Sequence, residues 1–275
     1  MPELPLERYE FSRRDDQRLG RALQRTTQRC MRSFGFADFP LDPKPQVGSG
    51  GEHVVALTMT TVSPYGMLDL DQARRWGYGI EPDRLRRLRA GVRPKGRALT
   101  QQEYEVLYGF DAERGGRDVV NGRVLPEGGC SGEGMREVTG GAAERARLWG
   151  YVQERKGKID KAVAGDRRVR DAFGGWSRCV VDKGFKRYEN PSQAYRDKAW
   201  REGRKDGNTH RTKRELETAV ADVECSRKLN VAGVWWVVSN EKQREELRRH
   251  KSRYEVVGKN QMRVRARVSE VLGER

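Results

Sequence analysis

The stretch CMRSFGFADFP at residues 30–40 decides how this sequence is interpreted, because it recurs in outline as CVVDKGFKRYENP at residues 179–191. In both copies a cysteine stands five residues before a glycine, and an aromatic residue and then a proline follow. A glycine directly after the last apolar position is the preferred left-handed terminator of a helix. Each copy is therefore predicted to end a helix that carries a cysteine near its last turn, and the two copies indicate one structural device used twice.

This repeat also sets the expected domain organisation. A chain of 275 residues is long enough for one large domain or for two ordinary ones. The repeat favours two regions, an N-terminal helix with an irregular Gly-rich segment at residues 1–140 and a basic helical region at residues 141–275. One continuous domain is the alternative.

The spacing of apolar residues predicts helices along much of the chain, and no strand-like alternation recurs. The helices are expected at residues 12–34, 71–76, 101–108, 142–164, 169–182, from Thr212 onwards, and at 239–269. A further helix is expected to start at Pro82 and Asp83. Ser12 with Asp15, and Thr212 with Glu215, have the pattern of capping boxes. Residues 41–53 and 115–141 are rich in Gly or Pro and are expected to form loops, with Cys130 in the second, and residues 54–62 are expected to be irregular.

The chain has four cysteines, Cys30, Cys130, Cys179 and Cys225. Four cysteines allow three pairings, and the repeat suggests that each Cys-x4-Gly helix is tied to the next cysteine, so that Cys30 pairs with Cys130 and Cys179 with Cys225. A zinc site is one alternative, although zinc ligands usually come as close pairs two to four residues apart. Buried free thiols are the other. The predicted fold class is therefore mainly α, with helical hairpins and long Gly/Pro-rich loops stapled by two disulfides, and no metal is expected.

The composition supports a need for covalent staples. Charged residues make up 35% of the chain, and Leu, Ile, Val and Phe together lie just under the roughly 20% below which a highly charged chain tends to disorder. A disulfide typically contributes about 2 to 4 kcal/mol to stability. A chain that needs such bonds is expected in an oxidising compartment. The longest apolar stretch, residues 231–238, is too short to span a membrane. The first residues lack a signal-peptide pattern, which counts against secretion but also suits a mature chain with an added start methionine.

The formal net charge of +16 points to an anionic partner. Such a partner is an envelope polymer of the teichoic-acid type, an anionic lipid or a nucleic acid; a solvated basic surface without a dedicated ligand is the plainer interpretation. Over the whole chain Arg outnumbers Lys, which resembles the residue bias of a GC-rich genome. The sharpest candidates for an anion-binding helix face, with Tyr254 among them, are Arg248, Arg249, Lys251, Arg253, Lys259, Arg263, Arg265 and Arg267.

No catalytic pattern stands out. The only histidines are His53, His210 and His250, and none lies in a local signature that would make it the base for a cysteine nucleophile. There is no Gly-x-Ser-x-Gly elbow, and the Gly-rich segment lacks the Lys-Ser/Thr of a phosphate-binding loop. We therefore expect no enzyme activity and no cofactor.

Several motifs resemble a family of uncharacterised actinobacterial proteins that are usually expected to be exported and often lipid-anchored. They are Leu4-Pro5-Leu6-Glu7-x-Tyr9, Cys30-Met31-x3-Gly35-Phe36, Arg75-Trp76-Gly77-Tyr78-Gly79, Leu125-Pro126-x-Gly128-Gly129-Cys130, Trp176-x2-Cys179-x4-Gly184-Phe185 and Ala221-Asp222-x2-Cys225. The resemblance implies structural roles for these cysteines, glycines and aromatic residues, and no known activity.

Together these observations predict a non-enzymatic secreted or cell-envelope protein that binds an anionic envelope component through its basic C-terminal half. The alternative is a cytoplasmic nucleic-acid-binding protein that uses the C-terminal helix.

Overall fold

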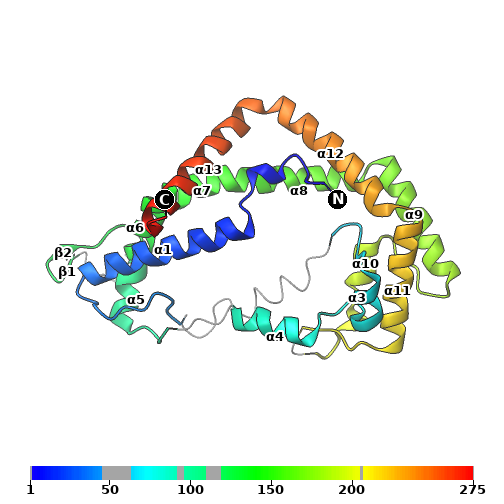
Figure 1. Ribbon diagram of the computed structural model, residues 1–275, viewed down its shortest axis with the longest axis horizontal. Helices are drawn as coiled ribbons and strands as arrows, with labels where there is room; N and C mark the ends of the chain where they lie inside the picture. Colours follow the sequence, from blue (N-terminus) through cyan, green and yellow to red (C-terminus); the bar gives the residue numbers. More distant parts are fainter. Residues whose placement is uncertain (1, 45–62, 92–95, 110–118, 205–206, 275) are drawn as a thin grey trace. The chain divides into compact units, whose positions relative to one another are not determined.

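A computed structural model describes residues 2–44, 63–91, 96–109, 119–204 and 207–274. Helices make up most of this structure, which confirms the predicted mainly α class (Figure 1). The strands in these ranges are β1 (Val119–Val120) and β2 (Arg123–Val124), which form a small antiparallel hairpin. The expectations for residues 45–62, which include His53, and for residues 92–95 and 115–118 fall outside the described residues.

The chain divides into two compact units. The described residues of 1–2, 49–93 and 158–243 form unit 1, and those of 3–48, 94–157 and 244–275 form unit 2. Both units draw on residues from either side of position 140, so this division does not coincide with the expected regions 1–140 and 141–275. Its cause is that C-terminal residues pack against the first long helix.

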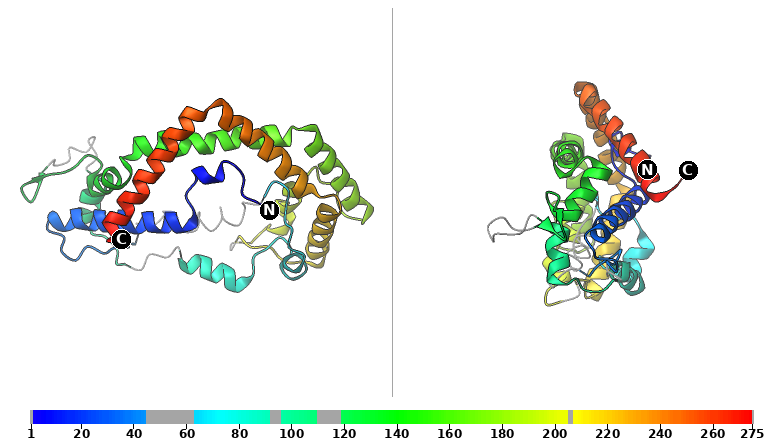
Figure 2. Two further views of the ribbon diagram at one scale, coloured as in Figure 1. Left: turned by 45° about the horizontal axis from the view of Figure 1, so that its top comes forward. Right: turned by 90° about the vertical axis from the view of Figure 1, so that its left-hand side faces the viewer.

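Unit 2 is organised around helix α1 (Arg13–Ser33), which follows a short 3-10 turn η1 (Glu7–Tyr9). The other elements of this unit are α5 (Gln101–Tyr108), α6 (Gly129–Thr139), α7 (Ala142–Arg145), the π-helical turn η3 (Ala146–Gly150), the start of α8 (Tyr151–Ala164), the end of α12 (Val231–Arg249) and α13 (Lys251–Leu272). Helices α6 and α13 both contact α1 (Figure 2). Leu19 and Ala22 of α1 are buried with Val264 and Val268 of α13 in one apolar cluster. The sequence pattern of α1 is confirmed, including the reciprocal capping box of Ser12 and Asp15.

Unit 1 contains α3 (Leu70–Trp76), α4 (Pro82–Gly91), α9 (Arg167–Asp182), α10 (Pro191–Tyr195), the 3-10 turn η4 (Lys198–Trp200) and α11 (Lys213–Lys228), with the end of α8 and the start of α12. Its apolar core joins α3, α9 and α11, with Trp176 fully buried. The capping box expected at the start of α11 forms only in half. Thr212 accepts the backbone N–H of Glu215, but the Glu215 carboxylate accepts the N–H groups of Arg211, at 2.7 Å, and of Tyr78, at 3.1 Å.

The two Cys-x4-Gly-Phe stretches end their helices in the same way, as predicted. Gly35 has φ 95° and Gly184 has φ 87°, a left-handed region that favours glycine. After each glycine, the N–H of a phenylalanine returns to a carbonyl five residues earlier, from Phe36 to Met31 at 3.2 Å and from Phe185 to Val180 at 3.3 Å. This is the bonding pattern of a Schellman cap, so the same terminator ends α1 in unit 2 and α9 in unit 1.

The Gly-rich segment differs from its expected loop, because residues 129–139 form helix α6 with Cys130 in its first turn. The glycines here allow close packing. A Cβ on Gly134 would lie 2.9 Å from the hydroxyl oxygens of both Thr26 and Thr27 on α1. Close contact between two helices therefore outweighs the low helix propensity of glycine.

The basic C-terminal segment also differs from the single helix expected at residues 239–269. The apolar residues 231–238 already belong to α12, and the chain breaks at His250 before α13 begins. His250 has φ −123° and ψ 31°, outside the helical region.

Candidate functional site

Both predicted disulfides are confirmed. Cys30 is bonded to Cys130 with a Cα–Cα distance of 5.5 Å, and Cys179 is bonded to Cys225 at 5.9 Å. The first links α1 to α6 within unit 2, and the second links α9 to α11 within unit 1. No free cysteine is left. The zinc and free-thiol alternatives are thereby excluded for these residues.

The two helices that the second disulfide joins also share a buried polar cluster. Trp176 Nε1 donates to Asp222 Oδ1 at 2.9 Å, and the Tyr78 hydroxyl donates to Oδ2 at 3.2 Å. Ser226 adds a third hydrogen bond, at 3.3 Å. Burial raises the pKa of Asp222 to about 7, against the opposing effect of these three hydrogen bonds. Its donors come from inside the core, so the cluster acts as structure and offers no access to a substrate.

The predicted anion-binding residues do not form one continuous free face. Four of them pair with carboxylates: Arg249 with Glu245, Lys251 with Glu255, Arg265 with Asp15, and Arg267 with Glu137 and Glu270. Arg253 lies over the ring of Tyr151, 5.1 Å from its centroid. Arg248, Lys259 and Arg263 are exposed. Tyr254 is buried and bonds to Glu246.

The other two histidines contact neither a serine nor a cysteine in the described part of the chain. His210 Nε2 lies 2.7 Å from the carbonyl oxygen of Glu202. His250 Nε2 lies 3.4 Å from Nη2 of Arg155 and 3.8 Å from Glu246 Oε2. Neither arrangement includes a serine or cysteine nucleophile.

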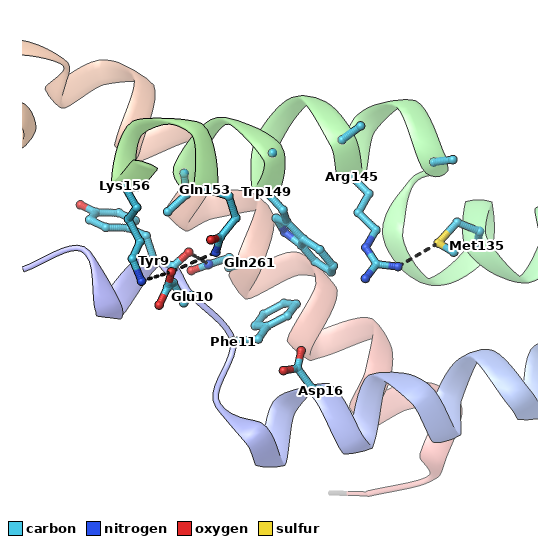
Figure 3. Close-up of a pocket in the computed structure, with 14 residues that line it drawn as sticks. Tyr9, Glu10, Phe11, Asp16, Met135, Arg145, Trp149, Gln153, Lys156 and Gln261 are labelled. Carbon is cyan, nitrogen blue, oxygen red and sulfur yellow. Dashed lines mark hydrogen bonds and ion pairs between the residues drawn. The ribbon is translucent and has the colours of Figure 1, made fainter. Parts of the chain in front are cut away.

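Unit 2 contains a cavity of about 750 Å³ (Figure 3). Its wall comes from η1 and the residues that follow it, the first turn of α1, α6, α7, the π-helical turn η3, α8 and α13. The lining residues are Tyr9, Glu10, Phe11, Asp16, Met135, Ala142, Arg145, Ala146, Trp149, Gly150, Val152, Gln153, Lys156 and Gln261. Ligand-binding cavities have volumes of roughly 300 to 1,000 Å³, so this space suits a small organic molecule.

One wall of the cavity is aromatic. The rings of Phe11 and Trp149 meet edge to face with 4.7 Å between centroids. The guanidinium of Arg145 lies over the indole, 4.6 Å from its centroid. Figure 3 shows these three side chains together, with Asp16 beside Phe11. The indole Nε1 of Trp149 is buried and has no hydrogen-bond acceptor among the described residues, so ring contacts alone orient this side chain.

The charged groups of the cavity fall into two sets. Glu10 is neutralised, because it accepts from Lys156 Nζ at 2.7 Å and from Gln153 Nε2 at 3.0 Å. Arg145 and Asp16 form no ion pair within the described part of the chain; the one polar contact of Arg145 is the sulfur of Met135 at 3.9 Å. Partial desolvation raises the pKa of the Asp16 carboxyl, although the residue is exposed, and the charge of Arg145 partly opposes this.

Sequence reasoning did not single out these cavity residues. They come from seven separate elements, and the π-helical turn that carries Trp149 has no simple sequence signature. The only local signal was Gly150, a poor helix former within a helical pattern. Cavity prediction would have required the tertiary arrangement.

Comparisons with protein-family models, with curated proteins and with solved structures find no match to this chain. Within the described ranges, no helix is both long and apolar enough to cross a bilayer. In the same ranges, no group of three or more His, Cys, Asp or Glu side chains is arranged to hold a metal ion.

Proposed function

We propose that the protein is a non-enzymatic secreted or cell-envelope protein that binds an anionic envelope component, with a polymer of the teichoic-acid type as the expected class. The observation that carries this proposal is the pair of disulfides, one in each unit, which together use every cysteine. Structural disulfides persist in oxidising compartments and are rare in the cytosol. The resemblance to an exported actinobacterial family points in the same direction.

The net charge of +16 supports an anionic partner. The exposure of the C-terminal cations indicates which of them are available to bind it. Arg249 and Lys251 are 69% and 82% exposed, and exposed ion pairs are weak enough for another anion to replace their acidic partners. Arg265 and Arg267 are more enclosed and tie α13 to Asp15 and Glu137. The exposed cations near the α12–α13 junction are therefore the proposed contact residues, and the enclosed pair supports the fold.

The compartment is tested by counting thiols in protein taken from its native cells with an alkylating agent present at lysis. We expect no reactive thiol before reduction and all four cysteines reactive afterwards. Four reactive thiols in the unreduced protein would contradict an exported location.

The partner is tested by retention on immobilised poly(glycerol phosphate) and on duplex DNA at the same series of salt concentrations. We expect retention on the glycerol phosphate polymer that persists to salt concentrations at least as high as on DNA, because the proposed ligand is the envelope polymer. Retention on DNA with none on the polymer would favour the nucleic-acid alternative.

A further inference from the structure

We infer that the cavity of unit 2 binds a small planar organic carboxylate, with its ring in the apolar part of the cavity and its carboxylate on Arg145. This inference is separate from the binding of an envelope polymer and does not depend on the compartment. It follows from three features of the cavity, namely its small-residue floor, its aromatic wall and its unpaired guanidinium.

The floor is hollow because of three small residues at helical spacing. Ala142, Ala146 and Gly150 are four residues apart and all line the cavity, and residues at this spacing share one face of a helix. Gly150 lies in the π-helical turn, and a Cβ built on it would meet no atom within 4 Å. The space is therefore open to a flat apolar group, with Val152 and Met135 as further apolar walls.

The aromatic wall of the cavity holds the Arg145 side chain in place. Stacking on the indole of Trp149 holds the guanidinium of Arg145 at 4.6 Å, which leaves the edge of the guanidinium, with its N–H groups, available in the plane of the fork. Those groups meet only the weak sulfur acceptor of Met135 among the described residues. A carboxylate matches this geometry, because it can accept two parallel N–H bonds from one guanidinium.

The other charged residues of the cavity favour a ligand with one negative group over a ligand with two. Lys156 is already paired with Glu10, so it is not available for a second anion. Asp16 is exposed, lines the cavity and forms no ion pair within the described residues; its charge opposes any anion on Arg145. Removal of the Asp16 charge should therefore tighten binding.

The test is isothermal titration calorimetry of the full chain with 2-naphthoate, and with 2-naphthylmethanol as the neutral ligand of similar shape. We expect saturable binding of 2-naphthoate with a Kd below about 1 mM, and binding of the alcohol that is at least about tenfold weaker. Absence of saturable naphthoate binding, or equal affinity for the alcohol, would overturn the inference.

Four variants locate the binding. Arg145→Met should weaken naphthoate binding roughly 10- to 100-fold through loss of charge-assisted hydrogen bonds, and Ala146→Leu should abolish it by filling the floor. Arg147→Gln and Ala143→Leu are the matched controls, because both residues are exposed on the same helical segment and neither lines the cavity. An unchanged Kd in Arg145→Met, or equal losses in both controls, would place binding elsewhere.

Asp16→Asn gives a readout in the opposite direction. We expect it to tighten naphthoate binding several-fold while it leaves the affinity for 2-naphthylmethanol unchanged. A structural disturbance of the cavity would weaken both ligands together, so this variant separates a charge effect from a folding defect.

Discussion

Trp176 Nε1 donates a 2.9 Å hydrogen bond to Asp222 Oδ1, and each of these residues stands three positions before the cysteine that its helix contributes to the disulfide. A polar bond and a covalent bond therefore join α9 and α11 at adjacent turns. Because Asp222 is fully buried and burial raises its pKa, we expect the polar bond to depend on pH.

The pKa of Asp222 predicts a pH window for the stability of unit 1. Burial raises this pKa to about 7, whereas an unfolded Asp titrates near 3.9. Between these values the folded state holds a proton that the unfolded chain has lost, so the free energy of unfolding should fall as pH rises, by on the order of 4 kcal/mol. Asp222→Asn should remove this slope. Hydrogen exchange of α9 and α11 at pH 4 and pH 8, corrected for the pH dependence of intrinsic exchange, measures it, and parallel pH dependence in both proteins would contradict the assignment.

The two disulfides should stabilise their own units. Cys30→Ala/Cys130→Ala should lower the stability of unit 2, and Cys179→Ala/Cys225→Ala that of unit 1, each by about 2 to 5 kcal/mol. The first bond closes a sequence separation of 100 residues and the second one of 46. Loop entropy therefore predicts a loss larger by about 0.7 kcal/mol in unit 2. Hydrogen exchange resolved by helix checks this, and equal loss of protection in both units for either variant would be inconsistent with it.

The close contact between α6 and α1 predicts opposite effects for two glycine substitutions. Gly134→Ala would place a Cβ 2.9 Å from two threonine hydroxyls and should destabilise unit 2 by roughly 1 to 3 kcal/mol. Gly20 lies on α1, and a Cβ there would meet no atom within 4 Å. Gly20→Ala should therefore stabilise unit 2 by about 0.5 to 1 kcal/mol. Urea unfolding of both variants compares them, and the idea fails if Gly134→Ala is neutral.

Substitutions of the exposed cations should affect polymer binding, whereas substitutions of the enclosed cations should affect stability. Arg248→Gln/Arg249→Gln should reduce the salt slope of binding to poly(glycerol phosphate) by about 2, with the unfolding midpoint unchanged. Arg265→Gln/Arg267→Gln should instead lower the free energy of unfolding by about 1 kcal/mol, because both residues hold α13 to neighbouring elements. The reverse pattern would move the polymer contact onto the enclosed pair.

Local chemistry made part of this fold predictable. The caps at Gly35 and Gly184 and the box at Ser12 need only neighbouring residues, so their patterns were sufficient. The disulfide pairing followed because the cap is repeated. Features that depend on distant partners were missed. Cys130 lies in a helix whose Gly134 packs closely against α1, and Glu215 turns from its own cap toward the N–H of Tyr78.

The candidate site was less predictable than the fold. The list of C-terminal cations could be read from charge, but which of them are neutralised depends on Asp15, Glu137 and other acids far away in sequence. The cavity cannot be predicted in this way, because Phe11 and Trp149 meet only after the chain has folded.

The interleaved make-up of unit 2 has a consequence for how the protein is made. Val264 and Val268 of α13 complete an apolar cluster that includes Leu19 of α1. During translation, α1 is therefore synthesised long before α13, against which it packs. Until α13 has been synthesised and has packed against α1, that apolar surface is open to aggregation. C-terminal truncation at residue 243 would likewise leave α1 without this partner, so the basic tail is better studied by point substitution than by deletion.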